Sequence, residues 1–399
     1  MSPAEARLPT IEALAAAKEI LVMCGPGGVG KTSMAAAVAA MAAVHQGGRV
    51  LVLTVDPARR LAQALGLDSK AQGAQQVPPG AFGPAGASPR GELWAEMLDT
   101  KMSWDRLVRR HAPDPMTARR ILDNILYQNI SGRFVQSHDY IAVERLYELH
   151  SEGNYDLIVV DTPPTRNAVD FLLAPERMAD FFSSRLLRLL AVPYRSRFVD
   201  VAAKPFYYVA DRVLGSQFLE EIAEFFILFQ TLSDGFIARA REVQRLLGDN
   251  RTSFVVVTTT ETVPVREAEA FMQLLPSRRL ALGGVVLNKV LPRYLLEKGI
   301  AAEAERLGAD AAGLAERLCS SDAALAEHGP VLVERVLREL ATNFNNISVV
   351  AKREEGQRAE IARVAQILAE VPELEEDVHD LGGVLALGGH IWSPAPQPI

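Results

Sequence analysis

A glycine-rich segment between an apolar run and an alanine-rich run constrains the fold of this 399-residue chain most strongly. Residues 25–32 read Gly-Pro-Gly-Gly-Val-Gly-Lys-Thr, which matches the pattern G-x-x-x-x-G-K-S/T. Residues 19–24 predict a buried strand, and residues 33–40 predict a helix without a breaker. Glycines in such a loop let successive backbone N–H groups and the helix N-terminus point at a phosphate. The alternative is a glycine turn that matches by chance, which the flanking strand and helix make rarer.

The side chains of this loop predict a nucleoside triphosphate as its ligand. We expect Lys31 to reach the β- and γ-phosphates and to act in catalysis, and the Thr32 hydroxyl to bind Mg²⁺. The loop residues expected to contact the nucleotide are Gly25, Gly27, Gly28, Val29, Gly30, Lys31, Thr32 and Ser33. ATP and Mg²⁺ are therefore the expected cofactors.

Composition and charge exclude several other classes of protein. Hydrophobic residues make up 49% of the chain and charged residues 23%, which is ordinary for a soluble globular protein. The net charge of −7 argues against sequence-independent nucleic-acid binding, which needs a basic face. Residues 1–7 lack the basic start and apolar core of a signal peptide, and no uncharged apolar run of about eighteen residues occurs. We expect a cytoplasmic protein that does not span a membrane and does not bind nucleic acid.

Short apolar runs alternate with helical stretches, which is the pattern of a mostly parallel sheet. Most of these runs are almost continuously apolar, as expected for strands covered on both faces. The candidate strands, about seven, are residues 19–24, 49–55, 92–98, 155–160, 253–258, 282–287 and 347–350. The sequence therefore predicts an α/β fold with helices on both faces of the sheet.

We predict a single nucleotide-binding domain over residues 17–370. Two stretches without strands, at about 99–151 and 166–249, are expected to be helical insertions into it. Residues 371–399 are expected to form a C-terminal appendage with a disordered end. Residues 72–91, rich in Gly, Pro, Ala and Gln, are expected to be a surface loop.

Two acidic residues follow predicted strands. Asp161 ends the apolar strand at 155–160, where a Walker-B carboxylate would hold Mg²⁺ directly or through water. Asp56 follows the second strand and could orient or deprotonate an attacking water at the carboxyl edge of the sheet. It could equally cap the next helix, since Asp-Pro-Ala is a helix start signal. Both interpretations of Asp56 stay open.

Asn288 closes the predicted strand at 282–287. Its amide could pair with both a donor and an acceptor on an adenine edge. It could also be a turn residue that ends the strand. We include Asn288 among the expected nucleotide contacts, with the turn as the alternative.

These three elements resemble the arsenite-pump and tail-anchored-protein-targeting ATPases, a family of deviant Walker A P-loop ATPases. The family's loop reads G-K-G-G-V-G-K-T, its first switch begins D-P-A, and its second switch reads D-T-A-P-T. The corresponding residues here are 25–32, 56–58 and 161–165. The resemblance implies a P-loop fold and an ATP-hydrolysing dimer with nucleotides at its interface. It also implies that Asp56 positions the catalytic water and that Asn288 contacts adenine.

Two departures from the family pattern bear on function. Pro26 occupies the position of the signature lysine, which would reach across the dimer to the partner's phosphates. Hydrolysis could then be slow, another basic residue could compensate, or a paralogous subunit could supply the cation. The chain also has only Cys24 and Cys319, without a Cys-x-x-Cys motif. We therefore expect no zinc, and arsenite transport is disfavoured.

The resemblance implies an ATP-driven molecular switch that couples nucleotide state to the handling of a protein client. The alternative is a weakly hydrolysing regulatory subunit in a heterodimer with a paralogous ATPase. Apolar residues at helical spacing in 179–245 could form a groove for a client, or could pack within the protein. The sequence leaves open both the groove and the choice between homodimer and heterodimer.

Overall fold

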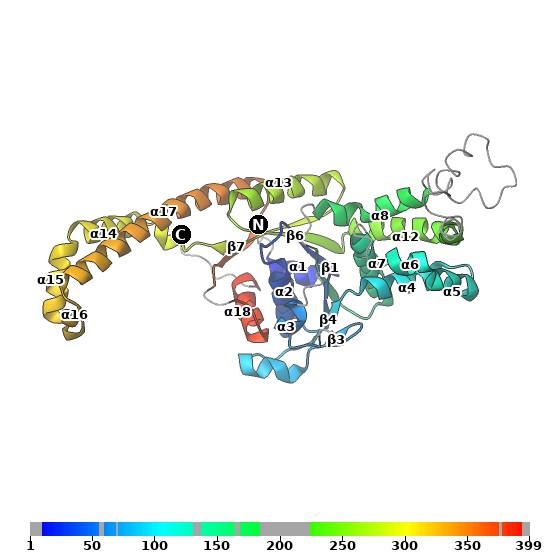
Figure 1. Ribbon diagram of the computed structural model, residues 1–399, viewed down its shortest axis with the longest axis horizontal. Coiled ribbons are helices and arrows are strands. Elements are labelled where there is room, and N and C mark those ends of the chain that lie inside the picture. The colour runs from blue at the N-terminus through cyan, green and yellow to red at the C-terminus, as the bar shows by residue number, and fades with distance from the viewer. Residues whose placement is uncertain are drawn as a thin grey trace, which may run out of the picture.

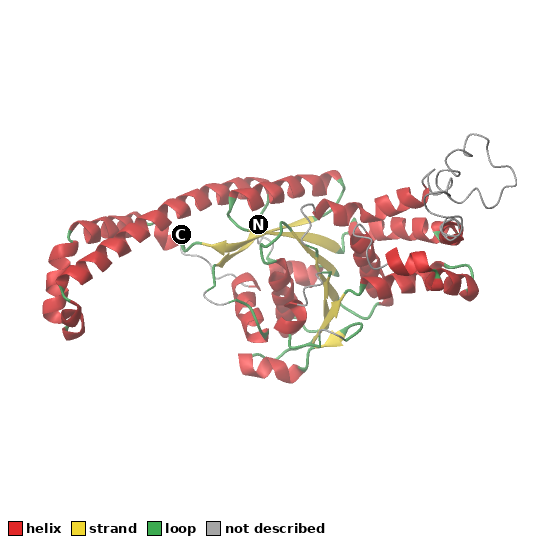
Figure 2. Ribbon diagram, in the orientation of Figure 1, coloured by secondary structure: helices red, strands yellow, loops and turns green. Residues whose placement is uncertain are grey.

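The computed structural model describes residues 10–55, 60–68, 71–130, 137–163, 168–183, 224–374 and 377–392. An eight-stranded sheet in the order β3-β4-β2-β5-β1-β6-β7-β8 runs through it (Figures 1 and 2). Neighbouring strands are parallel except β3 and β4, which are antiparallel. The strands are β1 Ile20–Cys24, β2 Arg49–Thr54, β3 Gln75–Gln76, β4 Glu92–Met97, β5 Leu157–Asp161, β6 Thr252–Thr258, β7 Leu282–Val290 and β8 Ile367–Pro372. The predicted α/β fold with a mostly parallel sheet is confirmed.

Alternating side chains of the sheet fill two separate cores. In β1, Ile20 and Val22 point into one core, whereas Leu21 and Met23 point into the other, and all four are fully buried. Because both faces are covered, most positions of the central strands are apolar, as the sequence predicts.

Different helices cover the two faces of the sheet. The first core contains side chains from α4 Thr100–His111, α5 Pro115–Asp123, α6 Ile125–Ile130, α7 Ser137–Glu152, α8 Ala168–Ser183, α12 Ser233–Leu247 and α13 Thr262–Ser277. The second core contains side chains from α1 Ile11–Ala17, α2 Lys31–His45, α3 Arg60–Ala64, the 3₁₀ helix η1 Pro79–Ala85 and α18 Leu381–Trp392. The glycine-rich loop joins β1 to α2 at the carboxyl edge of the sheet, where open α/β sheets bind ligands.

The expected insertions at 99–151 and 166–249 contain helices where the structure describes them. Asp99 begins α4 by accepting a hydrogen bond from the Met102 N–H at 2.9 Å, and Asp114 caps α5 in the same way. Residues 184–223, and with them much of the candidate groove, lie outside the described residues.

The described aromatic residues of 179–245 mostly pack inside the protein. Phe182, Phe225 and Phe229 are at most 7% exposed. The Phe182 ring stacks on Phe229 and Phe236, with centroids 5.2 and 4.7 Å apart. These contacts support internal packing rather than an open groove for these three residues.

The strand expected at residues 347–350 is wrong. These residues lie within α17 Pro330–Val364, and the last strand is β8 at 367–372. Helices α14 Lys298–Ala309 and α15 Ala311–Ser321 pack along α17 in an arm at one end of the molecule (Figure 1). The arm also contains η2 Arg293–Leu296 and α16 Ala323–His328. The strand preference of the short β-branched run at 347–350 is thus overridden by the long helix that contains it.

Two further segments differ from the expected loop and appendage. Residues 72–91 include β3 and η1, and Phe82 is 1% exposed in the second core. Within 371–399, α18 packs along α2, and Trp392 is 3% exposed. None of the helices in the described ranges combines the length and apolar character that a bilayer crossing requires.

Candidate nucleotide-binding site

Three glycines give the loop a backbone that other residues rarely adopt. The φ angles of Gly25, Gly28 and Gly30 are 144°, 79° and 90°. A Cβ on Gly25 would overlap the Val257 carbonyl of β6, and one on Gly30 would lie 2.5 Å from Nδ2 of Asn288. The loop is therefore pressed against the ends of β6 and β7, and glycine is needed at both positions.

Helix α2 begins at this loop and points its N-terminus at the same space. Gly30 is the N-cap residue, and the first turn contains no acidic side chain. The N-terminus of a helix carries a partial positive charge and N–H groups without intrahelical partners. An anion in the loop would satisfy both, because no carboxylate of the first turn competes for them.

Lys31 folds back over the loop that it follows. Its Nζ donates a hydrogen bond of 2.7 Å to the carbonyl oxygen of Pro26, and the residue is 5% exposed. A backbone carbonyl accepts this bond whatever the side chain, so proline preserves the internal geometry of the loop. Pro26 removes only the cation and the N–H that a lysine would supply there.

Asp161 lies at the carboxyl end of β5 and is fully buried. Its Oδ2 accepts hydrogen bonds from the Thr32 hydroxyl at 2.6 Å and from the Thr54 hydroxyl at 2.8 Å. Thr32 belongs to the first turn of α2, and Thr54 is the last residue of β2. Three elements thus bring oxygen atoms to one point beside the loop.

Thr54 was missed as a site residue in the sequence. The register could have revealed it, because Thr54 pairs with Asp161 across the parallel β2–β5 ladder. Two neighbouring parallel strands that end in polar residues place those residues at the same edge. Next to Asp161, the Thr162 hydroxyl donates a hydrogen bond of 3.0 Å to the Met23 carbonyl and so connects the end of β5 to β1.

Asn288 contacts the loop from the end of β7 and is 9% exposed. Its Nδ2 donates a hydrogen bond of 2.9 Å to the Val29 carbonyl. Its Oδ1 accepts a hydrogen bond of 2.9 Å from the Lys289 N–H. Lys289 has a φ of 58° and lies where the pairing of β7 with β8 is irregular. Asn288 therefore supports the loop from within β7, which continues to Val290, so the alternative that Asn288 ends the strand is wrong. Its contact with adenine stays a prediction.

The other expected site residues divide into described and undescribed ones. Gly27 and Gly28 are exposed at the tip of the loop, Val29 is buried and Ser33 is half-buried. Asp56 and residues 164–167 lie outside the described residues. The structure therefore brings the loop, Asp161 and Asn288 together, and the proposed water-positioning role of Asp56 stays a prediction.

The two cysteines lie in different parts of the fold and do not share a site. Cys24 lies in β1 and donates a weak bond to the Val255 carbonyl at 3.4 Å, whereas Cys319 lies in α15. Burial raises the pKa of the Cys24 thiol, and the nearby Lys31 ammonium opposes this only in part. Cys24 therefore packs as a small apolar residue.

The residues at this edge fit a magnesium nucleotide. Hard cations such as Mg²⁺ prefer carboxylate and hydroxyl oxygens, which Asp161 and Thr32 present within 2.6 Å of each other. The glycine backbone, the α2 N-terminus and Lys31 carry N–H donors that phosphates would accept. Donors for an anion thus lie beside oxygen ligands for a cation.

Comparison with known proteins settles the family. The sequence profile of the anion-transporting ATPases matches residues 18–306, which is more than half of the chain. The chain belongs to this family. The resemblance to arsenite-pump and tail-anchored-protein-targeting ATPases is thereby confirmed at the level of the family, and the chain is a member of a family of ATPases.

Individual relatives in the anion-transporting ATPase family are distant. An uncharacterised protein of Streptomyces coelicolor is 30% identical over 278 residues, covering 68% of this chain and 62% of its own length. A protein of Paramecium tetraurelia named ATPase ASNA1 homolog 1 is 26% identical, over 67% of this chain and 73% of its own length. A putative arsenical pump-driving ATPase of Aquifex aeolicus is 22% identical, covering 70% and 65%. The chain thus spans less than two thirds of the length of the Streptomyces relative.

Proposed function

We propose that this chain is a Mg²⁺-dependent ATPase that works as a dimeric switch. The arrangement around Asp161 is the observation that supports Mg²⁺-dependent ATP hydrolysis most directly. Asp161 is buried and accepts a hydrogen bond from the hydroxyl of Thr32, the residue after Lys31. A metal site beside a phosphate requires such a carboxylate next to such a hydroxyl. When bound, Mg²⁺ would neutralise charge on the β- and γ-phosphate oxygens.

The residues of the chain would orient the phosphates, hold the ion and position the attacking water. The loop N–H groups and Lys31 would orient the phosphates, and Thr32 and Asp161 would hold the ion. Asp56 would orient the attacking water. Phosphoryl transfer asks little covalent chemistry of a protein beyond such positioning and charge stabilisation.

We further propose that nucleotide state is passed to a protein client through the helical layer. Helix α8 begins at Ala168, shortly after Asp161, and ends at Ser183 beside the buried Phe182. A change at the carboxyl end of β5 would thus shift a helix that packs on α7 and α12. Segments ordered by a γ-phosphate act in this way in other nucleotide switches.

A second candidate is a regulatory subunit of a heterodimer, and Pro26 favours it. The proline keeps the loop geometry through its carbonyl but supplies no cation for a partner's phosphates. Loss of such a cation can cost about 10³ or more in rate in related phosphoryl-transfer systems. A paralogous subunit with the lysine would then provide most of the turnover.

Asp161→Asn tests the proposed metal site. We expect the amide to weaken binding of ATP in the presence of Mg²⁺ by about tenfold or more, because an uncharged ligand replaces a carboxylate. Binding of ATP in the presence of a chelator should match that of the parent protein. Titration calorimetry with and without Mg²⁺ measures both. Equal affinity of the two proteins for the Mg²⁺ complex would contradict the assignment.

A further inference from the structure

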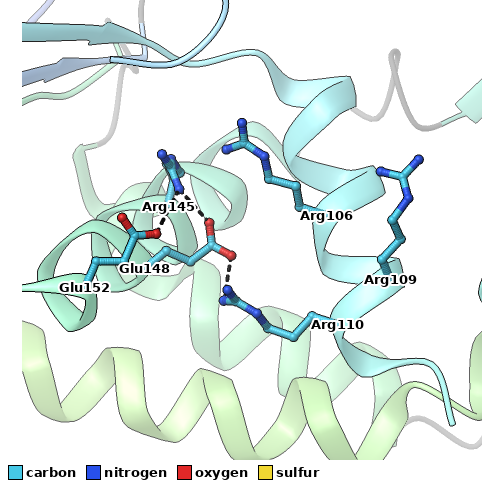
Figure 3. Close-up of a pocket in the computed structure, with 6 residues that line it drawn as sticks. All are labelled: Arg106, Arg109, Arg110, Arg145, Glu148 and Glu152. Atoms are coloured by element: carbon cyan, nitrogen blue, oxygen red, sulfur yellow. Dashed lines mark hydrogen bonds and ion pairs between the residues drawn. The ribbon is translucent and has the colours of Figure 1, made fainter. Parts of the chain in front are cut away.

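A pocket lies between α4 and α7, separate from the candidate nucleotide site (Figure 3). Its volume is about 570 Å³. It is lined by Arg106, Arg109, Arg110, Arg145, Glu148 and Glu152. Four guanidinium groups thus face two carboxylates in a chain whose net charge is −7.

The inner wall of this arginine pocket is held rigidly by ion pairs. Arg145 binds both oxygens of Glu96, at 2.7 and 3.0 Å, and its Nη1 lies 3.0 Å from Glu148. The Arg145 side chain is only 11% exposed. Arg110 lies 2.6 Å from the other oxygen of Glu148. The charge of Glu148 is therefore already shared by two guanidinium groups.

The opposite wall has cations without such partners. Arg106 contacts the sulfur of Met102 at 3.7 Å, and within the described residues no carboxylate lies within ion-pair distance of Arg106 or Arg109. The neighbouring acid on α4, Asp105, accepts the Tyr127 hydroxyl at 2.8 Å. Figure 3 shows Arg106 extending toward Arg145 across the pocket, with Arg109 at its outer edge. Like charges that face one another in this way repel unless an anion lies between them.

We propose that this pocket binds a small phosphate ester. The planar fork of a guanidinium matches two oxygens of a phosphate or a carboxylate, and Arg106 presents such a fork. The fork of Arg145 is occupied by Glu96, so Arg145 would contribute only positive charge behind the bound group. A pocket of this volume suits a small organic molecule rather than a single ion. The phosphate would lie at Arg106, on the side that faces Arg145 (Figure 3).

Glu152 favours a ligand with hydroxyl groups. Its carboxylate is 46% exposed and lies 3.9 Å from Arg145, so it can accept further hydrogen bonds. Next to a bound phosphate, an acceptor of this kind suits an alcohol or an ammonium and repels a second acid. The pocket thus fits a phosphorylated polyol better than a polycarboxylate such as citrate.

Calorimetric titration of the full chain, with ADP and Mg²⁺ present to occupy the nucleotide site, tests this assignment. The probes are glycerol 3-phosphate, inorganic phosphate and citrate. We expect saturable binding of glycerol 3-phosphate, weakened about tenfold or more in Arg106→Ala, because a charge-assisted bidentate contact is lost. Arg106→Lys should fall between the two, since it keeps the charge but loses the fork.

Two matched variants distinguish the arginine pocket from the exposed surface and from the nucleotide loop. Arg119→Ala removes an 85% exposed arginine of α5 and should bind glycerol 3-phosphate like the parent chain. Lys31→Ala should also leave this binding unchanged, whereas equal loss in Lys31→Ala would assign the anion to the nucleotide loop. Unaltered binding in a folded Arg106→Ala, absence of saturable binding, or binding of citrate in place of the phosphate ester would each overturn the proposal.

Discussion

A single carboxylate oxygen, Oδ2 of Asp161, accepts hydroxyl groups from two separate elements. Thr32 approaches from the first turn of α2 and Thr54 from the end of β2. Hydrogen bonds to a buried charged group contribute more than neutral ones, roughly 1.5–3 kcal/mol each. The two threonines therefore fix the carboxylate and offset the cost of burying it.

Thr54→Val removes one of these hydroxyls with little change in shape. We expect the free energy of unfolding to fall by about 2 kcal/mol, since Asp161 keeps its charge but loses a donor. Urea titration followed by circular dichroism measures this. Thr54→Ser, which restores a hydroxyl, should recover most of the loss. Equal stability of the valine and serine variants would contradict the account of this contact.

Glu144 on α7 is a second buried carboxylate, and its environment is less favourable. Arg239 Nε lies 3.0 Å from its Oε1, yet neither atom makes an aligned hydrogen bond. Burial therefore dominates and raises the pKa of Glu144 to about 7, although Arg239 partly opposes this. Close by, burial together with Arg239 and Arg110 lowers the pKa of His111 to about 4.

These two groups affect stability in opposite directions as the pH changes. The folded protein binds the Glu144 proton more tightly than the unfolded chain does. This group therefore lowers the free energy of unfolding as pH rises from about 4.5 to about 7. His111 resists protonation when folded, so it destabilises folding as pH falls from about 6.5 to about 4. The parent protein should show a shallow pH dependence because the two effects overlap.

The substitution Glu144→Gln should separate the pH effect of Glu144 from that of His111. Near pH 4.5 the variant should match the parent in free energy of unfolding, and above pH 7 it should be more stable by up to about 3 kcal/mol. The His111 effect should then become visible as a loss of stability below pH 6.5. Urea unfolding at pH values across this range provides the comparison. Parallel stability curves for the two proteins would show that the pKa of Glu144 is not raised.

At the scale of elements, the sequence predicted six of the strands and missed the character of the C-terminal region. The strands β1, β2, β4, β5, β6 and β7 were evident because each is a short apolar run flanked by breakers or helices. Residues 347–350 resemble a strand by composition, but they lie in the 35-residue helix α17 and are largely exposed. They are part of one long helix along which α14 and α15 pack, and a pattern of four residues does not reveal it.

The contact between β4 and α7 depends on a buried ion pair. Glu96 is 3% exposed and its carboxylate is bound by both Nε and Nη2 of Arg145. Removing one partner of such a pair leaves the other charged and buried, which is costly even where the intact pair contributes little.

Arg145→Met should therefore lower the free energy of unfolding by about 3–5 kcal/mol, because Glu96 is left without its cation. Thermal and urea unfolding both report this change. Arg119→Met, at an exposed position, should change stability by less than about 0.5 kcal/mol. The double variant Glu96→Gln, Arg145→Met should recover part of the loss. A similar stability for Arg119→Met and Arg145→Met would rule out this role for the pair.

At the scale of the whole molecule, the nucleotide elements were the most predictable part of the candidate site. The loop and Asp161 could be placed from sequence because each lies at a strand end, and the sheet gathers strand ends at one edge. The bond from Asn288 to Val29 and the arginine pocket could not be foreseen. Both join residues that are far apart in the sequence, and no local pattern links them.

At this scale, the proposed dimeric switch depends most on Pro26. The loop geometry tolerates the proline because Lys31 uses only its carbonyl oxygen. If a second copy of this chain is sufficient for catalysis, the missing cation slows turnover without abolishing it. If a paralogue is required, the chain alone will bind ATP and not hydrolyse it.

The most direct test is ATP turnover by the purified chain with Mg²⁺ over a wide range of protein concentrations, with Asp56→Asn as the background. We predict that turnover per subunit rises with concentration, reaches a plateau, and exceeds that of Asp56→Asn at the plateau while both proteins bind ATP. Turnover equal to that of Asp56→Asn at every concentration would contradict a self-sufficient ATPase and indicate a partner subunit.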